Sequence, residues 1–130
     1  MTIEYEAISR RSFSDVVADV ERFTTEKSFR VLHVHDVQAT LREKGFHREP
    51  LKIIEICNAR FAHQTLEKNI SVSLFMPCKI NVYTEAGMTK IKALRPAAIA
   101  EFFPDDGLDA LAGEVDKIVI EIVDRAAQGA

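Results

Sequence analysis

The sequence lacks the features of a disordered, fibrous or nucleic-acid-binding chain. Its 130 residues include only five glycines and four prolines, too few for a collagen-like or low-complexity protein. Basic and acidic residues nearly balance, at 17 against 20, and no basic run exceeds the pair Arg10–Arg11. A net charge of −3 supplies no field that attracts a polyanion. We therefore expect no nucleic-acid partner.

Long hydrophobic runs are also missing. No segment approaches the roughly 18 consecutive apolar residues of a membrane span, and Lys52 and Glu55 interrupt the apolar stretch 51–57. The N-terminus alternates acidic and apolar residues and has no signal-peptide pattern. These absences predict a cytoplasmic protein with no membrane partner. The two cysteines, Cys57 and Cys78, are then expected to be reduced unless redox chemistry is their purpose.

What the chain does have is material for one core. Hydrophobic residues make up 47% of it, and its length suits a single domain, residues 1–130. Alternating or β-branched segments predict strands, and apolar residues at three- and four-residue spacing predict helices. The strands are predicted at 3–11, 29–35, 51–57, 78–84 and 88–94, with helices at 13–25, after Asp36, after Asn58, after Pro96 and at 108–126. Segment 70–75 is ambiguous between loop and strand. The pattern is that of an α+β fold.

Polar residues mark the starts of three helices. Ser12, Asp36 and Asn58 each precede an apolar periodic segment and carry a side-chain oxygen that can cap it. The last helix carries a regular apolar seam, formed by Leu108, Leu111, Val115, Ile118 and Ile122. That seam favours packing on a sheet, and a coiled-coil dimer seam is the alternative.

Two cysteines define one candidate site. Cys57 ends a predicted strand, and Cys78 begins a later one, directly after Pro77. A thiol beside a helix N-terminus feels the positive end of the helix dipole, which lowers its pKa, and Cys57 immediately precedes the proposed cap Asn58. The alternative is that both cysteines are small buried hydrophobes.

Other candidate side chains are less specific. Glu55 lies on the same face of its strand as Cys57 and could move protons if it were buried. More often such a residue faces solvent or pairs with a lysine, and Lys79 is a possible partner. His33 and His35 also share a strand face, so they are weak candidates for a metal site. No phosphate-binding loop, nucleophile elbow or zinc motif is present, and we expect no metal and no cofactor.

Several segments together resemble the "domain of unknown function 302" family. They extend over most of the chain, from about Ser12 to Val123, and the pairs Cys57-Asn58 and Pro77-Cys78 are the most specific. The segments are Phe29–Leu32, Asp36, Leu41, Lys44–Phe46, Ile54–Asn58 and Met76–Tyr83. The resemblance implies a fold of the TATA-binding-protein class, a curved and mainly antiparallel sheet with helices packed on it. It also implies homodimers, without implying DNA binding.

Two functions follow from these residues. The first is a dimeric binding domain that holds a small molecule or partner near Cys57, Asn58, Pro77 and Cys78. The alternative is a thiol-based redox or sulfur-handling activity, with Cys57 as the nucleophile and Cys78 as the resolving thiol. The catalytic candidates would then be Cys57, Cys78 and Glu55, and whether the protein is an enzyme is left open.

Overall fold

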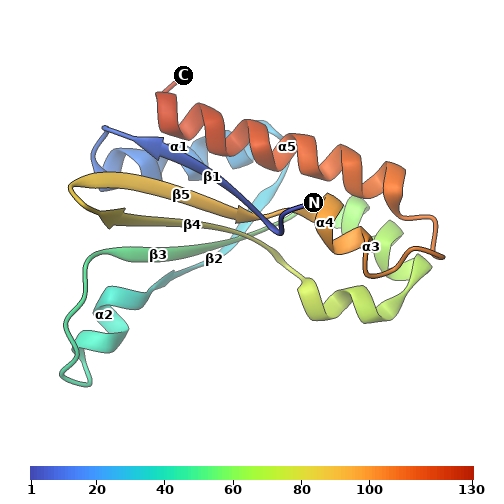
Figure 1. Cartoon of the computed structure of the whole chain (residues 1–130), viewed down its shortest axis with the longest axis horizontal. Helices are drawn as coiled ribbons and strands as arrows, with labels where there is room; N and C mark the ends of the chain where they lie inside the picture. Colours follow the sequence, from blue (N-terminus) through green and yellow to red (C-terminus); the bar gives the residue numbers. More distant parts are fainter.

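One antiparallel sheet organises the molecule. The computed structural model describes residues 1–130, and its five strands lie in the order β1-β5-β4-β3-β2 (Figure 1). Every neighbouring pair is antiparallel. The strands are β1 (Glu4–Ser9), β2 (Arg30–Asp36), β3 (Leu51–Cys57), β4 (Cys78–Glu85) and β5 (Met88–Leu94). The predicted α+β class and the antiparallel sheet are confirmed.

The helices cover one face of this sheet. Two long helices, α1 (Phe13–Glu26) and α5 (Asp109–Gln128), lie side by side on it (Figure 1). The shorter α3 (Ala59–Lys68), the 3-10 helix η1 (Ile70–Phe75) and α4 (Pro96–Ala100) gather at one end of the molecule, and α2 (Val37–Arg42) projects at the other. The second face of the sheet carries no helix. No helix combines the length and the apolar character that a bilayer crossing requires.

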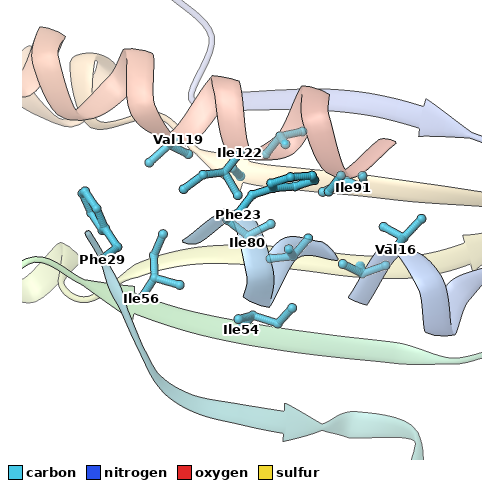
Figure 2. Close-up of a cluster of buried hydrophobic side chains, with 14 of the residues drawn as sticks. Val16, Phe23, Phe29, Ile54, Ile56, Ile80, Ile91, Val119 and Ile122 are labelled. Carbon is cyan, nitrogen blue, oxygen red and sulfur yellow. The ribbon is translucent and has the colours of Figure 1, made fainter. Parts of the chain in front are cut away.

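The core lies between the sheet and the two long helices (Figure 2). Alternate strand residues point into it, as the period-two pattern requires, and meet apolar side chains of α1 and α5. Its fully buried members include Ile54, Ile56, Ile80, Val82 and Ile91 from the sheet and Val16, Val20, Phe23, Ile122 and Val123 from the helices. Each such side chain contributes roughly 1.5–3 kcal/mol by leaving water.

The three predicted caps are present. The backbone N–H of Asp15 donates to Ser12 Oγ at 3.1 Å, that of Ala39 to Asp36 Oδ1 at 3.0 Å and that of Phe61 to Asn58 Oδ1 at 3.1 Å. The ambiguous segment 70–75 is a 3-10 helix, which Asn69 caps by accepting from the N–H of Ser71 at 2.8 Å. A short helix that such a local cap stabilises shows no periodic pattern of apolar residues from which the sequence alone would identify it.

The last helix begins and ends one to two residues later than predicted, and its stripe packs inside the chain. Val119, Ile122, Val123 and Ala126 are buried, whereas Ile118 is only partly buried. The buried side chains contact the sheet and α1, and they are not exposed as a seam for a second helix. Core packing, rather than a coiled-coil dimer seam, accounts for the periodicity.

A buried ion pair fixes α4 against α5. Asp116 is 5% exposed and accepts from Arg95 Nη2 at 2.8 Å, from Arg95 Nε at 3.3 Å and from the N–H of Ala97 at 3.2 Å. The carboxylate therefore both pairs with the guanidinium and caps the first turn of α4. The ion pair also positions one wall of a cavity, because α4 supplies part of that wall.

Removing that carboxylate should destabilise the fold. The substitution Asp116→Ala leaves the guanidinium of Arg95 and the N–H of Ala97 without their acceptor. We expect the free energy of unfolding to fall by about 2–4 kcal/mol, measured by urea denaturation. Glu114→Ala, at an exposed position of the same helix, should change it by less than about 0.5 kcal/mol. Similar effects for the two substitutions would contradict this role of Asp116.

Candidate functional site

The candidate site is a cavity at the end of the sheet where α3, η1, α4 and α5 meet. It has a volume of about 90 Å³ and is lined by 19 residues. Cys57, Asn58, Pro77 and Cys78 all contribute to its wall. The two segments that sequence reasoning singled out therefore border the same space, although 21 positions separate the cysteines.

The pairing of β3 with β4 brings the cysteines to this place. Cys78 lies directly opposite Ile56, and Cys57 is the next residue along β3, opposite Arg30 of β2. Successive strand residues point to opposite faces of the sheet. The side chain of Cys78 therefore points toward the helices, as that of Ile56 does, whereas the side chain of Cys57 points to the other face at the end of β3. The thiols are neighbours at one cavity, and both are free.

Asn58 shapes the wall without offering a free polar group. Its Oδ1 accepts from the N–H of Phe61, and its Nδ2 donates to the carbonyl of Ser28 at 3.0 Å. One side chain thus ties the start of α3 to the turn between α1 and β2. Both ends of the amide are engaged, so Asn58 positions its neighbours and is not available to orient a ligand.

The wall is apolar and uncharged. Fifteen of the 19 lining residues are hydrophobic, and the other four are Asn58, Thr65, Pro77 and Pro96. A charged group placed here would lose its hydration without gaining a partner. A molecule that entered this cavity would therefore have to be neutral and largely apolar.

Burial decides the protonation of both thiols. It raises the pKa of Cys57 and raises that of Cys78 to about 11. At Cys78 the charge that Cys57 would carry adds to the effect of burial, and nearby Lys79 only partly opposes it. The expected lowering of the Cys57 pKa by the helix dipole is therefore wrong. At neutral pH both thiols are protonated.

The other candidate side chains lie away from the cavity. Glu55, His33 and His35 are not part of its wall and belong to the helix-free face of the sheet, where the two imidazole rings meet edge to face at 4.3 Å. His35 Nε2 lies 3.2 Å from Glu55 Oε1. Cys57 and Cys78 thus border one cavity, and Glu55 is not part of its wall.

Lys79, the possible partner of Glu55, does not pair with it. The two residues are opposite each other in the register of β3 and β4, yet the ammonium of Lys79 donates to the carbonyl of Pro77 at 3.2 Å. The carboxylate of Glu55 lies beside His35 instead. No group of three or more histidine, cysteine, aspartate or glutamate side chains is arranged to hold a metal ion.

Sequence reasoning missed most of the cavity wall. Its aromatic side chains are Phe29, just before β2, Phe61 of α3 and Phe75 of η1. Its aliphatic side chains come from β3, η1, α4 and α5 and include Ile56, Val72, Ile99 and Val115. All are apolar residues of the kind that fill cores. Their spacing indicates burial, but it carries no signal that distinguishes a filled core from one that leaves a gap.

Comparison with known proteins agrees with the fold. The model of the family described as "Domain of unknown function DUF302" matches residues 5–126, so the chain belongs to this family. It is also similar to the crystal structure of an uncharacterized conserved DUF302 protein from Bacillus stearothermophilus. The TM-score is 0.90 at 29% sequence identity, covering 97% of this chain and 99% of the other. No curated protein matches the sequence.

The raised pKa values predict slow thiol alkylation. At pH 8 the thiolate fraction of Cys78 is on the order of one in a thousand for a pKa near 11. Cys57 should react with iodoacetamide more slowly than a thiol in an unfolded peptide, and Cys78 more slowly still. The rate at Cys78 should rise about tenfold per pH unit above pH 8, because each unit increases the thiolate fraction tenfold.

Peptide mapping by mass spectrometry measures both rates separately. Protein denatured in urea is the control, and there the two cysteines should react at equal rates. An apparent pKa of Cys57 below that of a free thiol, roughly 8.5, would contradict the dominance of burial and would favour a nucleophilic role.

Proposed function

We propose that this protein binds a small, uncharged and largely apolar molecule in the cavity beside Cys57 and Cys78. One observation carries the proposal: the wall of a preformed cavity of about 90 Å³ contains no charged residue. The cavity is partly open to solvent, so a ligand somewhat larger than this volume can extend out of it. Ligand burial is then driven by the removal of apolar surface from water.

The two thiols are recognition groups in this proposal. A protonated thiol is a weak hydrogen-bond donor on a small, polarisable, hydrophobic side chain. It contacts an apolar ligand without imposing a desolvation penalty of the size that a carboxylate or an ammonium would impose. The raised pKa of each cysteine keeps this neutral form present across the physiological range.

The thiol-based alternative has weaker support. Both cysteines border one cavity, as a nucleophile and its resolving partner would. However, the thiolate is the reactive species, and burial raises both pKa values. Glu55, the nearest candidate for a general base in sequence, lies outside the cavity. Recognition rather than reaction is therefore the better account of the same residues.

Filling the cavity should abolish ligand binding. Ala112 lines the cavity from α5, and Ala112→Leu adds a branched chain where the ligand would lie. We expect toluene, a neutral probe of suitable size, to bind the unmodified protein with a Kd on the order of 0.1–1 mM. The variant should bind toluene at least about tenfold more weakly, because the leucine side chain would occupy the volume that toluene otherwise fills.

A substitution elsewhere on α5 provides the control. Ala110→Leu introduces the same side chain at an exposed position two residues away and should leave the Kd unchanged. Chemical-shift titration of backbone amides reports both the Kd and the location of the probe. The absence of toluene-dependent shifts in residues of the cavity wall would overturn the proposal.

The proposal extends to self-association through the helix-free face of the sheet. On that face Ile53 and Asn81 lie opposite each other in the register of β3 and β4, and the side chain of Ile8, on the edge strand β1, is 55% exposed. Apolar side chains on a sheet face that no helix covers form a surface that a second copy of the chain could bury. A location in the cytoplasm stays a prediction.

Light scattering coupled to size-exclusion chromatography tests the homodimer. We expect a mass twice that of one chain, and Ile53→Lys should shift it to that of one chain by placing an ammonium in the interface. Lys44→Glu, on the exposed segment after α2, should leave the dimer intact. A single-chain mass for the unmodified protein at every accessible concentration would refute self-association.

A further inference from the structure

A second space adjoins the apolar cavity. It is a shallow recess, largely open to solvent, lined by the exposed residues His63, Gln64, Glu67 and Lys68 of α3 and by Leu111 of α5. Leu111 also lines the cavity. The apolar cavity and the polar recess therefore meet at one side chain, between the same two helices.

The helical period of α3 places its apolar and its polar residues on different faces of the helix. Phe61, Ala62 and Thr65 face the cavity, whereas residues 63, 64, 67 and 68 line the recess. Positions 63 and 67, like positions 64 and 68, are four apart and lie on one side of a helix. One face of α3 thus offers apolar contacts, and the next offers polar ones.

The polar groups of the recess are balanced in charge. Glu67 and Lys68 carry opposite charges, and neither belongs to any of the ion pairs within the chain. The amide of Gln64 adds one acceptor and two donor hydrogens. An anionic group in the recess would gain Lys68 but face Glu67, and a cationic group would gain Glu67 but face Lys68. An uncharged group with several hydroxyl or amide functions can hydrogen-bond to Gln64, Glu67 and Lys68 together without repulsion from either charge.

We propose, building on the proposed function, that the ligand is an uncharged amphiphile whose apolar end fills the cavity and whose hydroxyl- or amide-bearing head lies in the recess beside Gln64, Glu67 and Lys68. Leu111 separates the two parts and contacts both. The cavity accounts for most of the binding energy through burial of the apolar end. The recess accounts for selection of the head, because hydrogen bonds to charged side chains discriminate among polar groups.

Three amphiphiles with one chain length test the head group. Octyl glucoside, octanoate and octylammonium, each below its micelle concentration, carry the same apolar end with an uncharged, anionic or cationic head. We expect octyl glucoside to bind about tenfold more tightly than either charged compound by isothermal titration calorimetry. Intermolecular NOEs should connect its glucose protons with side chains of the recess.

A double substitution isolates the recess from the cavity. Glu67→Ala with Lys68→Ala removes two polar groups without changing the net charge. It should weaken octyl glucoside about fivefold and leave toluene, which occupies only the cavity, unaffected. Glu43→Ala with Lys44→Ala removes a similar exposed acid–base pair elsewhere on the surface and should change neither. All four positions are exposed, so the variants should keep the thermal stability of the parent.

The outcomes separate the two proposals. Toluene binding with equal affinity for the three octyl compounds would overturn the amphiphile and leave the cavity as a site for small apolar molecules. The same holds if the Glu67 and Lys68 double variant binds octyl glucoside as tightly as the parent. Failure of toluene and of all three octyl compounds to bind would overturn both.

Discussion

The register between β3 and β4 is the constraint on which the rest of the structure depends. It sets Ile54 opposite Ile80 and Ile56 opposite Cys78, with the three isoleucines fully buried. A slip of one residue would turn the buried side chains of one strand to the helix-free face. At roughly 1.5–3 kcal/mol each, three such side chains represent a large share of the 5–15 kcal/mol by which domains are stable. The core thus fixes the register, and the register fixes the cysteines.

The same magnitudes explain why Cys57 does not have the lowered pKa that its place before a helix predicts. A helix dipole acting on a partly exposed group is worth typically 0.3–1 kcal/mol, and one pKa unit corresponds to about 1.4 kcal/mol. Desolvation can shift a buried group by several units. The sequence places the thiol of Cys57 beside the start of a helix, but it does not show that aromatic and aliphatic residues from other segments surround this thiol and exclude water from it. The aromatic and aliphatic side chains of the wall come from β3, α3, η1, α4 and α5 and from the residue before β2.

Features that short-range interactions determine could be predicted from the sequence, whereas features that depend on long-range contacts could not. Strands β3 and β5 have the bounds expected from their alternation, and the caps at Ser12, Asp36 and Asn58 are present because capping is decided within four residues. The convergence of Cys57 and Cys78 was a hypothesis that required β3 and β4 to be neighbours. Strand order, the partner of Glu55 and the cavity itself depend on contacts between distant segments, and no local pattern encodes them.

The cavity separates two hydrophobic clusters, and this separation argues for a role in binding. The main core lies under α1 and α5, and a smaller cluster of Val72, Ile99, Ala100 and Leu108 lies on the other side of the gap. The cavity of about 90 Å³ is partly open to solvent, and the apolar side chains of its wall lack packing partners there, which costs the fold stability. One larger aliphatic side chain at Ala62 or Ala112 would remove much of that loss.

A chain under selection for stability alone gains by such a replacement, whereas a chain that must admit a ligand retains the small residue. Destabilised sites of this kind are where proteins trade stability for function. The buried pair of Asp116 and Arg95 holds α4 in place across the gap, so the cavity stays open without collapse of its far wall. The small residues in the wall and the ion pair behind it are then two parts of one arrangement that leaves the cavity unfilled.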